Sequence, residues 1–111
     1  MKLKSMTDHD DIISLEGRLT SAEVTDVEQR HRARFDSGRF PLAVSLDNVE
    51  SGDSSALALL LEWQALARRA GREIRFENPP QGLRVIARLT GIEQLLGWQP
   101  DSHHSNTDRE Q

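Results

Sequence analysis

The feature that most constrains this chain is a pair of apolar runs, residues 42–46 and 56–61, separated by a polar stretch. The first run is short and continuous, which is typical of a strand buried on both faces. The second opens a segment that continues to about Ala70 and is apolar nearly all round in its first half, which is typical of a buried helix. A buried strand that leads into a long helix is part of a β-α-β unit, so we expect an α/β protein.

The other segments extend this pattern in both directions. Residues 3–6 and 12–15 flank a polar turn at residues 7–11, which predicts a β-hairpin whose second strand is closed by Gly17. Helix-long crossovers after the second and third strands favour a mixed sheet of four strands with helices packed on one side. The predicted order is β-β-α-β-α-β-α. After the hairpin we expect a helix from Thr20 or Ser21 to Gly38, a strand at 40–46 and a helix from Asp53 or Ser54 to about Ala70. A strand at 74–77, a helix at 83–90 and a helical turn at 92–96 follow.

The first predicted helix has a single apolar stripe, formed by Val24, Val27, His31 and Phe35 at helical spacing. Its acidic residues come early and its arginines late, an order that suits the helix dipole. A histidine on such a stripe is more often a core or boundary residue than a ligand, so no metal site is expected.

Composition and charge argue against several classes of protein. The 111 residues suffice for one domain with a core and are too few to expect two. A net charge of −4 and a pI near 5.5 disfavour a nucleic-acid-binding role, which needs clustered positive charge. The chain has no cysteine, no signal-peptide pattern at its start and no apolar run longer than six residues, so a cytoplasmic protein is expected.

The end of the chain differs in composition from the rest. Residues 99–111 contain no hydrophobic side chain that could join a core. We therefore expect a folded domain at residues 1–98 and a disordered polar tail at residues 99–111.

The start of the second predicted helix, at Asp53, Ser54 and Ser55, is the most informative place for function. Free backbone N–H groups make a first helical turn electropositive, so it attracts a phosphate or a partner's carboxylate. Ser51 and Gly52 belong to the unusually polar approach to this helix. One interpretation is a partner-contacting or phosphorylatable site with Ser54 at its centre. The other is that Asp53 is only an N-cap and that the serines are ordinary early-helix residues.

No catalytic pattern accompanies this helix start. Asp47 and Asp53 have no histidine or lysine nearby in the sequence, and we expect both to cap loops. The sequence lacks the usual glycine-rich phosphate loop, dinucleotide-binding, nucleophile-elbow and paired-cysteine motifs. Trp63 is expected in the core, and Trp98 is expected either in the core or as an anchor for a partner. The chain is therefore predicted not to be an enzyme and to bind no cofactor.

Three segments, residues 46–49, 53–61 and 91–96, resemble the STAS domain family (sulphate transporter and anti-sigma factor antagonist). The resemblance covers about residues 2–98, and the order of elements is similar too. In that family an Asp-Ser or Asp-Thr pair begins the helix after the third strand. The resemblance implies that Asp53 takes the acidic position and that Ser54 takes the position phosphorylated by anti-sigma kinases in the antagonist branch.

Within the family, residues 53–63, 68–71 and 83–87 are most similar to the lipid-asymmetry maintenance protein B (MlaB) branch. Its members are single-domain cytoplasmic subunits of a Gram-negative phospholipid-transport ABC complex, and they bind its ATPase subunit. This chain departs from the usual pattern where Ala56 replaces a common glycine and where Gly52 replaces an apolar residue.

The resemblance implies, as a leading hypothesis, a non-catalytic accessory subunit held at the inner membrane by an ABC transporter ATPase. Residues 51–55, with part of the neighbouring first helix, would then contact the ATPase. The alternative is an anti-sigma factor antagonist whose partner is an anti-sigma factor kinase and whose phosphorylated residue is Ser54. An enzyme is the third hypothesis, and it would need a pocket with convergent titratable groups.

Overall fold

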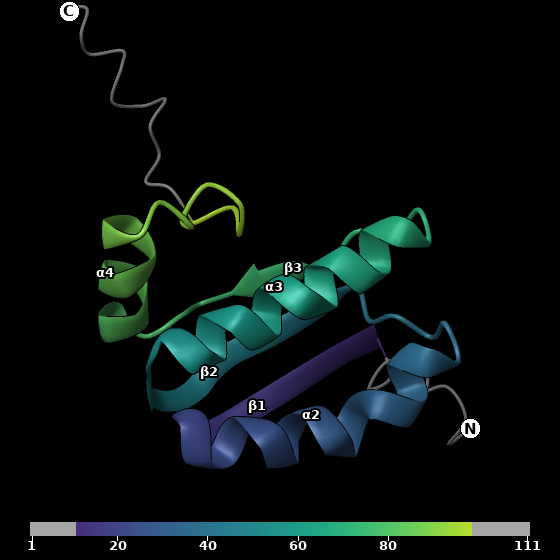
Figure 1. Cartoon of the computed structure of the whole chain (residues 1–111), viewed down its shortest axis with the longest axis horizontal. Coiled ribbons are helices and arrows are strands. Elements are labelled where there is room, and N and C mark those ends of the chain that lie inside the picture. Colours follow the sequence, from purple (N-terminus) through teal and green to yellow (C-terminus); the bar gives the residue numbers. More distant parts are fainter. Residues whose placement is uncertain (1–10, 99–111) are drawn as a thin grey trace, which may run out of the picture.

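The computed structural model describes residues 11–98, which form a parallel sheet of three strands and three helices (Figure 1). The central strand β2 pairs in parallel with β1 on one side and with β3 on the other. This arrangement confirms the predicted α/β class. In chain order the elements are β1 (Ile12–Leu19), α2 (Ser21–Asp36), β2 (Ala43–Gly52), α3 (Ser54–Arg69), β3 (Arg75–Glu77) and α4 (Gln81–Leu89).

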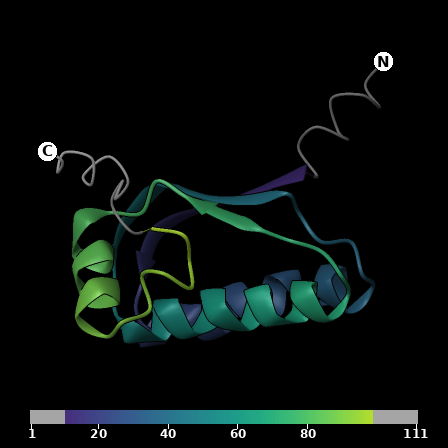
Figure 2. The same cartoon turned by 90° about the horizontal axis from the view of Figure 1, so that it is seen from above.

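The two crossover helices lie on the same face of the sheet. The helix α2 connects β1 to β2, and α3 connects β2 to β3, so that both run beneath the sheet in Figure 2. The strands follow one another in chain order across the sheet. Because crossovers between parallel strands have the same hand, two of them in succession place their helices on one face. The third helix, α4, stands across one end of these layers and contacts β2 and α3.

The central strand begins later and ends later than the sequence predicts. A strand was expected at residues 40–46, whereas β2 runs over Ala43–Gly52. Residues 47–50 have exposed polar side chains apart from the buried Val49, a pattern that resembles a loop. Their backbone nevertheless pairs with β1 as far as Leu19. Backbone hydrogen bonds to β1 keep this stretch extended, and the polarity of its side chains does not reveal them.

The strand β1 also continues past its predicted end at Gly17. The φ angle of Gly17 is +79°, in the left-handed region that glycine adopts without steric cost. The register with β2 shifts between Ser14 and Glu16 and again between Gly17 and Arg18. Gly17 therefore marks an irregularity within the strand, which ends at the fully buried Leu19.

Part of the predicted fold lies outside the described residues. This applies to the strand at residues 3–6 and its turn, to the four-stranded mixed sheet that this strand would complete, and to the tail at residues 99–111. Within residues 11–98 all strand pairs are parallel. None of the helices in this range has the length and the apolar character needed to cross a membrane.

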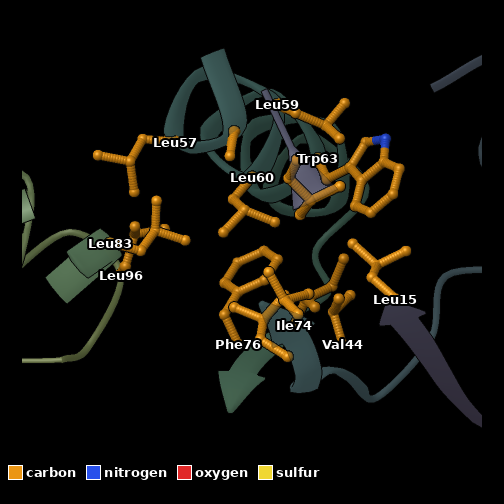
Figure 3. Packing of buried hydrophobic residues seen from close by; sticks show 14 of the residues in the cluster. Leu15, Val44, Leu57, Leu59, Leu60, Trp63, Ile74, Phe76, Leu83 and Leu96 are labelled. Atoms are coloured by element: carbon orange, nitrogen blue, oxygen red, sulfur yellow. The ribbon is translucent and has the colours of Figure 1, made fainter. Parts of the chain in front are cut away.

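The core lies between the sheet and the two crossover helices, and Trp63 of α3 is one of its most deeply buried side chains (Figure 3). The Trp63 ring stacks on Phe35 with ring centroids 4.8 Å apart, and His31 meets it edge-on at 5.6 Å. The Nδ1 atom of His31 lies 3.0 Å from the carbonyl oxygen of Val27. The predicted stripe on α2 therefore faces the core, with His31 as a partly buried boundary residue.

The segment after α4 is fastened to the outer edge of β3. In the predicted helical turn at residues 92–96, the Leu96 N–H donates to the carbonyl oxygen of Ile92 (3.2 Å). The indole N–H of Trp98 donates to the carbonyl oxygen of Phe76 (2.7 Å), and the Trp98 side chain is buried. Trp98 is therefore a core residue and not an exposed anchor for a partner.

Candidate partner-binding site

The start of α3 lies at the surface, at the carboxyl end of β2 and beside the start of α2 (Figure 1). Ser54, the first residue of the helix, is exposed, and so is Ser51. Gly52, Asp53 and Ser55 are partly buried. The structure thus brings all five residues singled out in the sequence to one end of the molecule.

Asp53 caps α3 and also ties it to α2. Its Oδ1 atom accepts a hydrogen bond from the backbone N–H of Ser55 (2.9 Å), which is the N-cap interaction that the sequence predicts. Its Oδ2 atom accepts one from the backbone N–H of Ser21 (3.3 Å), the first residue of α2. One carboxylate therefore satisfies an otherwise unpaired donor at the start of each helix. The bond to Ser21 spans 32 positions of the chain, so local sequence patterns could not reveal it.

The start of α2 has its own cap. The Glu23 carboxylate accepts hydrogen bonds from the backbone N–H of Thr20 (3.0 Å) and from the Thr20 hydroxyl. The bond from the hydroxyl, followed by the backbone bond, lowers the pKa of the Glu23 carboxyl below its usual value. With Asp53 and Glu23 engaged in capping, Ser54 presents a hydroxyl that makes no hydrogen bond within residues 11–98.

A shallow groove of about 430 Å³ continues from this helix start between the outer faces of α2 and α3. Ser55 belongs both to the helix start and to the groove, so the two form one continuous surface. Buried Leu59 lies in the groove, next to exposed small side chains. The groove is lined by Val24, Thr25, Glu28 and Arg32 of α2 and by Ser55, Ala58, Leu59 and Glu62 of α3.

The part of the groove that lies away from the start of α3 is lined by charged side chains. The Arg32 guanidinium donates two hydrogen bonds to the Glu28 carboxylate, at 3.0 Å and 2.6 Å. These bonds lower the pKa of Glu28 and raise that of Arg32. Glu62, also in the groove, forms no ion pair within 4.0 Å among residues 11–98, but its charge helps to raise the pKa of Arg32. A surface of this kind suits a protein segment with apolar and basic side chains.

The structure does not assemble a metal centre at this surface or elsewhere in the described range. No group of three or more histidine, aspartate or glutamate residues within residues 11–98 could hold a metal ion. Asp47 lies within β2, where its side chain is exposed, so the predicted loop-capping role of this residue is wrong. The predicted capping role of Asp53 is correct.

Comparison with protein families agrees with this architecture. A family model described as "Mlab, STAS domain" matches residues 3–97. The chain belongs to the STAS domain family. STAS domains are generally non-catalytic, and the match is to a model of the MlaB type. A search of curated proteins finds no significant match.

The two departures from the usual STAS pattern face each other in the structure. A Cβ atom placed on Gly52 would lie 3.3 Å from the Cβ of Ala56 and 3.1 Å from the Cδ1 of Leu83. The resemblance to STAS domains implies a glycine at position 56, where this chain has alanine, and an apolar residue at position 52, where it has glycine. The methyl group of Ala56 on α3 therefore occupies space next to position 52 that a side chain there would need. We therefore expect the two departures to compensate each other sterically in part.

This compensation predicts coupled effects on stability. We expect Gly52→Val to lower the free energy of unfolding by about 1–3 kcal/mol, because it overpacks the contact between β2, α3 and α4. In an Ala56→Gly background, the loss of unfolding free energy caused by Gly52→Val should be smaller by roughly 0.5 kcal/mol or more. Urea unfolding of the four proteins in this cycle measures the coupling. An equal cost in both backgrounds would show that positions 52 and 56 do not compensate.

Because Asp53 accepts two hydrogen bonds, replacing it should lower the free energy of unfolding more than an ordinary surface replacement does. We expect Asp53→Ala to lower the free energy of unfolding by about 1–2 kcal/mol, because both helix starts lose an acceptor. Asp53→Asn, which keeps one acceptor oxygen, should cost less. Asp47→Ala is the matched control. Because the Asp47 carboxylate is exposed, this replacement should change the free energy of unfolding by less than about 0.5 kcal/mol. Chemical denaturation tests the series, and an Asp53→Ala value as small as the control would contradict the bridging role.

Proposed function

We propose that this chain is a non-catalytic accessory subunit of an Mla-type phospholipid-transport ABC complex. It binds the cytoplasmic ATPase subunit, which it stabilises or activates, and the complex maintains the lipid asymmetry of the outer membrane. The match of residues 3–97 to a model of the MlaB type carries this proposal. The chain reaches the inner membrane through this partner.

The surface at the start of α3 supplies the contact. A serine at position 54 is small enough to let a second backbone approach closely, and its hydroxyl still offers a hydrogen bond. The groove beside it receives a partner segment, with the partly buried Val24 and the exposed Ala58 as apolar contacts and the exposed Glu62 as the partner of a basic side chain. Because Asp53 fixes the two helix starts to each other, little ordering is left to occur when the partner binds.

Replacing Ser54 by arginine tests this surface. The exposed position leaves the domain folded, but the long charged side chain keeps the partner's backbone away. We expect Ser54→Arg to lower the affinity for the co-expressed ATPase subunit by at least about tenfold, measured by co-purification and by titration of the purified proteins.

Gln94→Arg is the matched control, because Gln94 is also exposed but lies outside the candidate site and its groove. This variant should bind the ATPase normally. If Ser54→Arg co-purified as well as Gln94→Arg, the contact would have to lie elsewhere on the domain.

An anti-sigma factor antagonist is the second candidate function, and the exposed Ser54 hydroxyl in the first turn of α3 favours it. A phosphate on Ser54 would add charge where the helix dipole stabilises it. In this role, incubation with the cognate anti-sigma kinase and ATP should add one phosphate, detected by mass spectrometry. Ser54→Ala should stay unmodified. An unmodified wild-type chain that captures the ATPase would exclude this role and retain the transporter assignment.

A further inference from the structure

The end of the molecule opposite the candidate site is rich in arginine. Both crossover helices finish there, because both follow strands that run in the same direction (Figure 1). Arg34 and Arg39 lie at the end of α2 or just beyond it, and Arg68, Arg69 and Arg72 lie likewise around the end of α3. All of them are exposed except Arg34, which is partly buried. We call this set the basic end.

The basic end is only partly neutralised by the described carboxylates. Glu73 lies 3.6 Å from Arg68. Asp36 is the last residue of α2, and the exposed Asp11 directly precedes β1. Arg69 and Arg72 form no ion pair with any residue of the range 11–98. The chain as a whole has a net charge of −4, so positive charge has gathered at one end of an acidic protein.

Two large apolar side chains are exposed at the same end. Ile12 begins β1 and is 47% exposed, and Leu42, just before β2, is 51% exposed. The start of β1 and the start of β2 are neighbours, because the Leu42 N–H donates to the carbonyl oxygen of Asp11 (2.7 Å). Exposed apolar side chains at the same end of a domain as cationic ones are a combination found on surfaces that bind the membrane interface.

We propose that the basic end contacts the anionic headgroups of a lipid bilayer. Guanidinium groups donate paired hydrogen bonds to phosphate oxygens, and the attraction of each basic residue to an anionic membrane adds to that of the others. Ile12 and Leu42 enter the headgroup region at the same time. The charges stand on two separate helix ends, and none of them lines the groove between α2 and α3. That distribution fits a fluid anionic surface better than a shaped protein partner.

Membrane contact at the basic end leaves the candidate partner site free. The helix α3 has 16 residues, so its start and its end lie about 24 Å apart. One end of the domain can therefore hold a protein while the other lies on a bilayer. This proposal does not depend on the identity of the protein partner.

Co-sedimentation of the full chain with lipid vesicles tests the proposal. We expect binding to vesicles of phosphatidylglycerol and phosphatidylcholine, weaker binding as salt is added, and little binding to phosphatidylcholine alone. The double variant Arg69→Gln/Arg72→Gln should lower the partition coefficient by at least about tenfold. The matched control Arg18→Gln/Arg88→Gln removes the same charge from exposed positions outside the basic end and should bind nearly as well as the wild type.

The apolar part is tested by Ile12→Ser/Leu42→Ser, which should also weaken vesicle binding, with circular dichroism confirming that the variants fold. Failure of the wild type to bind anionic vesicles, or an equal loss in the two arginine variants, would overturn the proposal. So would a loss of ATPase binding in Arg69→Gln/Arg72→Gln with vesicle binding intact, because the basic end would then be a protein interface. Ser54→Arg should retain vesicle binding, which separates this result from the test of the proposed function.

Discussion

The parallel pairing of β2 with a strand on each side is the constraint from which the rest of the arrangement follows. Parallel neighbours need long crossovers, and strands that follow one another across the sheet send both crossover helices to the same face. The helices α2 and α3 therefore point the same way. Their first turns, whose N–H groups have no partner within the helix, meet at one end of the domain, and their last turns meet at the other. The candidate partner site and the basic end are the two products of this polarity.

Elements with strong local signals could be predicted from the sequence. The helices α2 and α3 begin where Thr20 and Asp53 cap them, because a cap acts on its own first turn. The second half of β2 could not be predicted, since residues 47–50 are mostly polar and become a strand only through pairing with β1. The burial of Trp98 likewise depends on an acceptor 22 positions earlier in the chain. Contacts between distant segments decided both outcomes.

The same division applies to the candidate site. Asp53, Ser54 and Ser55 were found because a helix start has a recognisable composition. The bond from Ser21 to Asp53 and the groove shared by α2 and α3 arise only when the two helices lie side by side. The proximity of position 52 to Ala56 and Leu83 also arises only from packing, because a Cβ atom at position 52 would meet both side chains. Sequence patterns therefore indicated the residues of the candidate site, and packing determines the shape of the surface around them.

The anchoring of Trp98 has a consequence for how the domain behaves at high concentration. The strand β3 has only three residues and forms one border of the described sheet. A border strand with free carbonyl and N–H groups invites pairing with a strand of another molecule, which leads to aggregation. Here an indole N–H occupies the carbonyl of Phe76, the middle residue of that strand, and the segment that carries the indole lies over the border. The tryptophan thus protects the sheet against unwanted extension by a second copy.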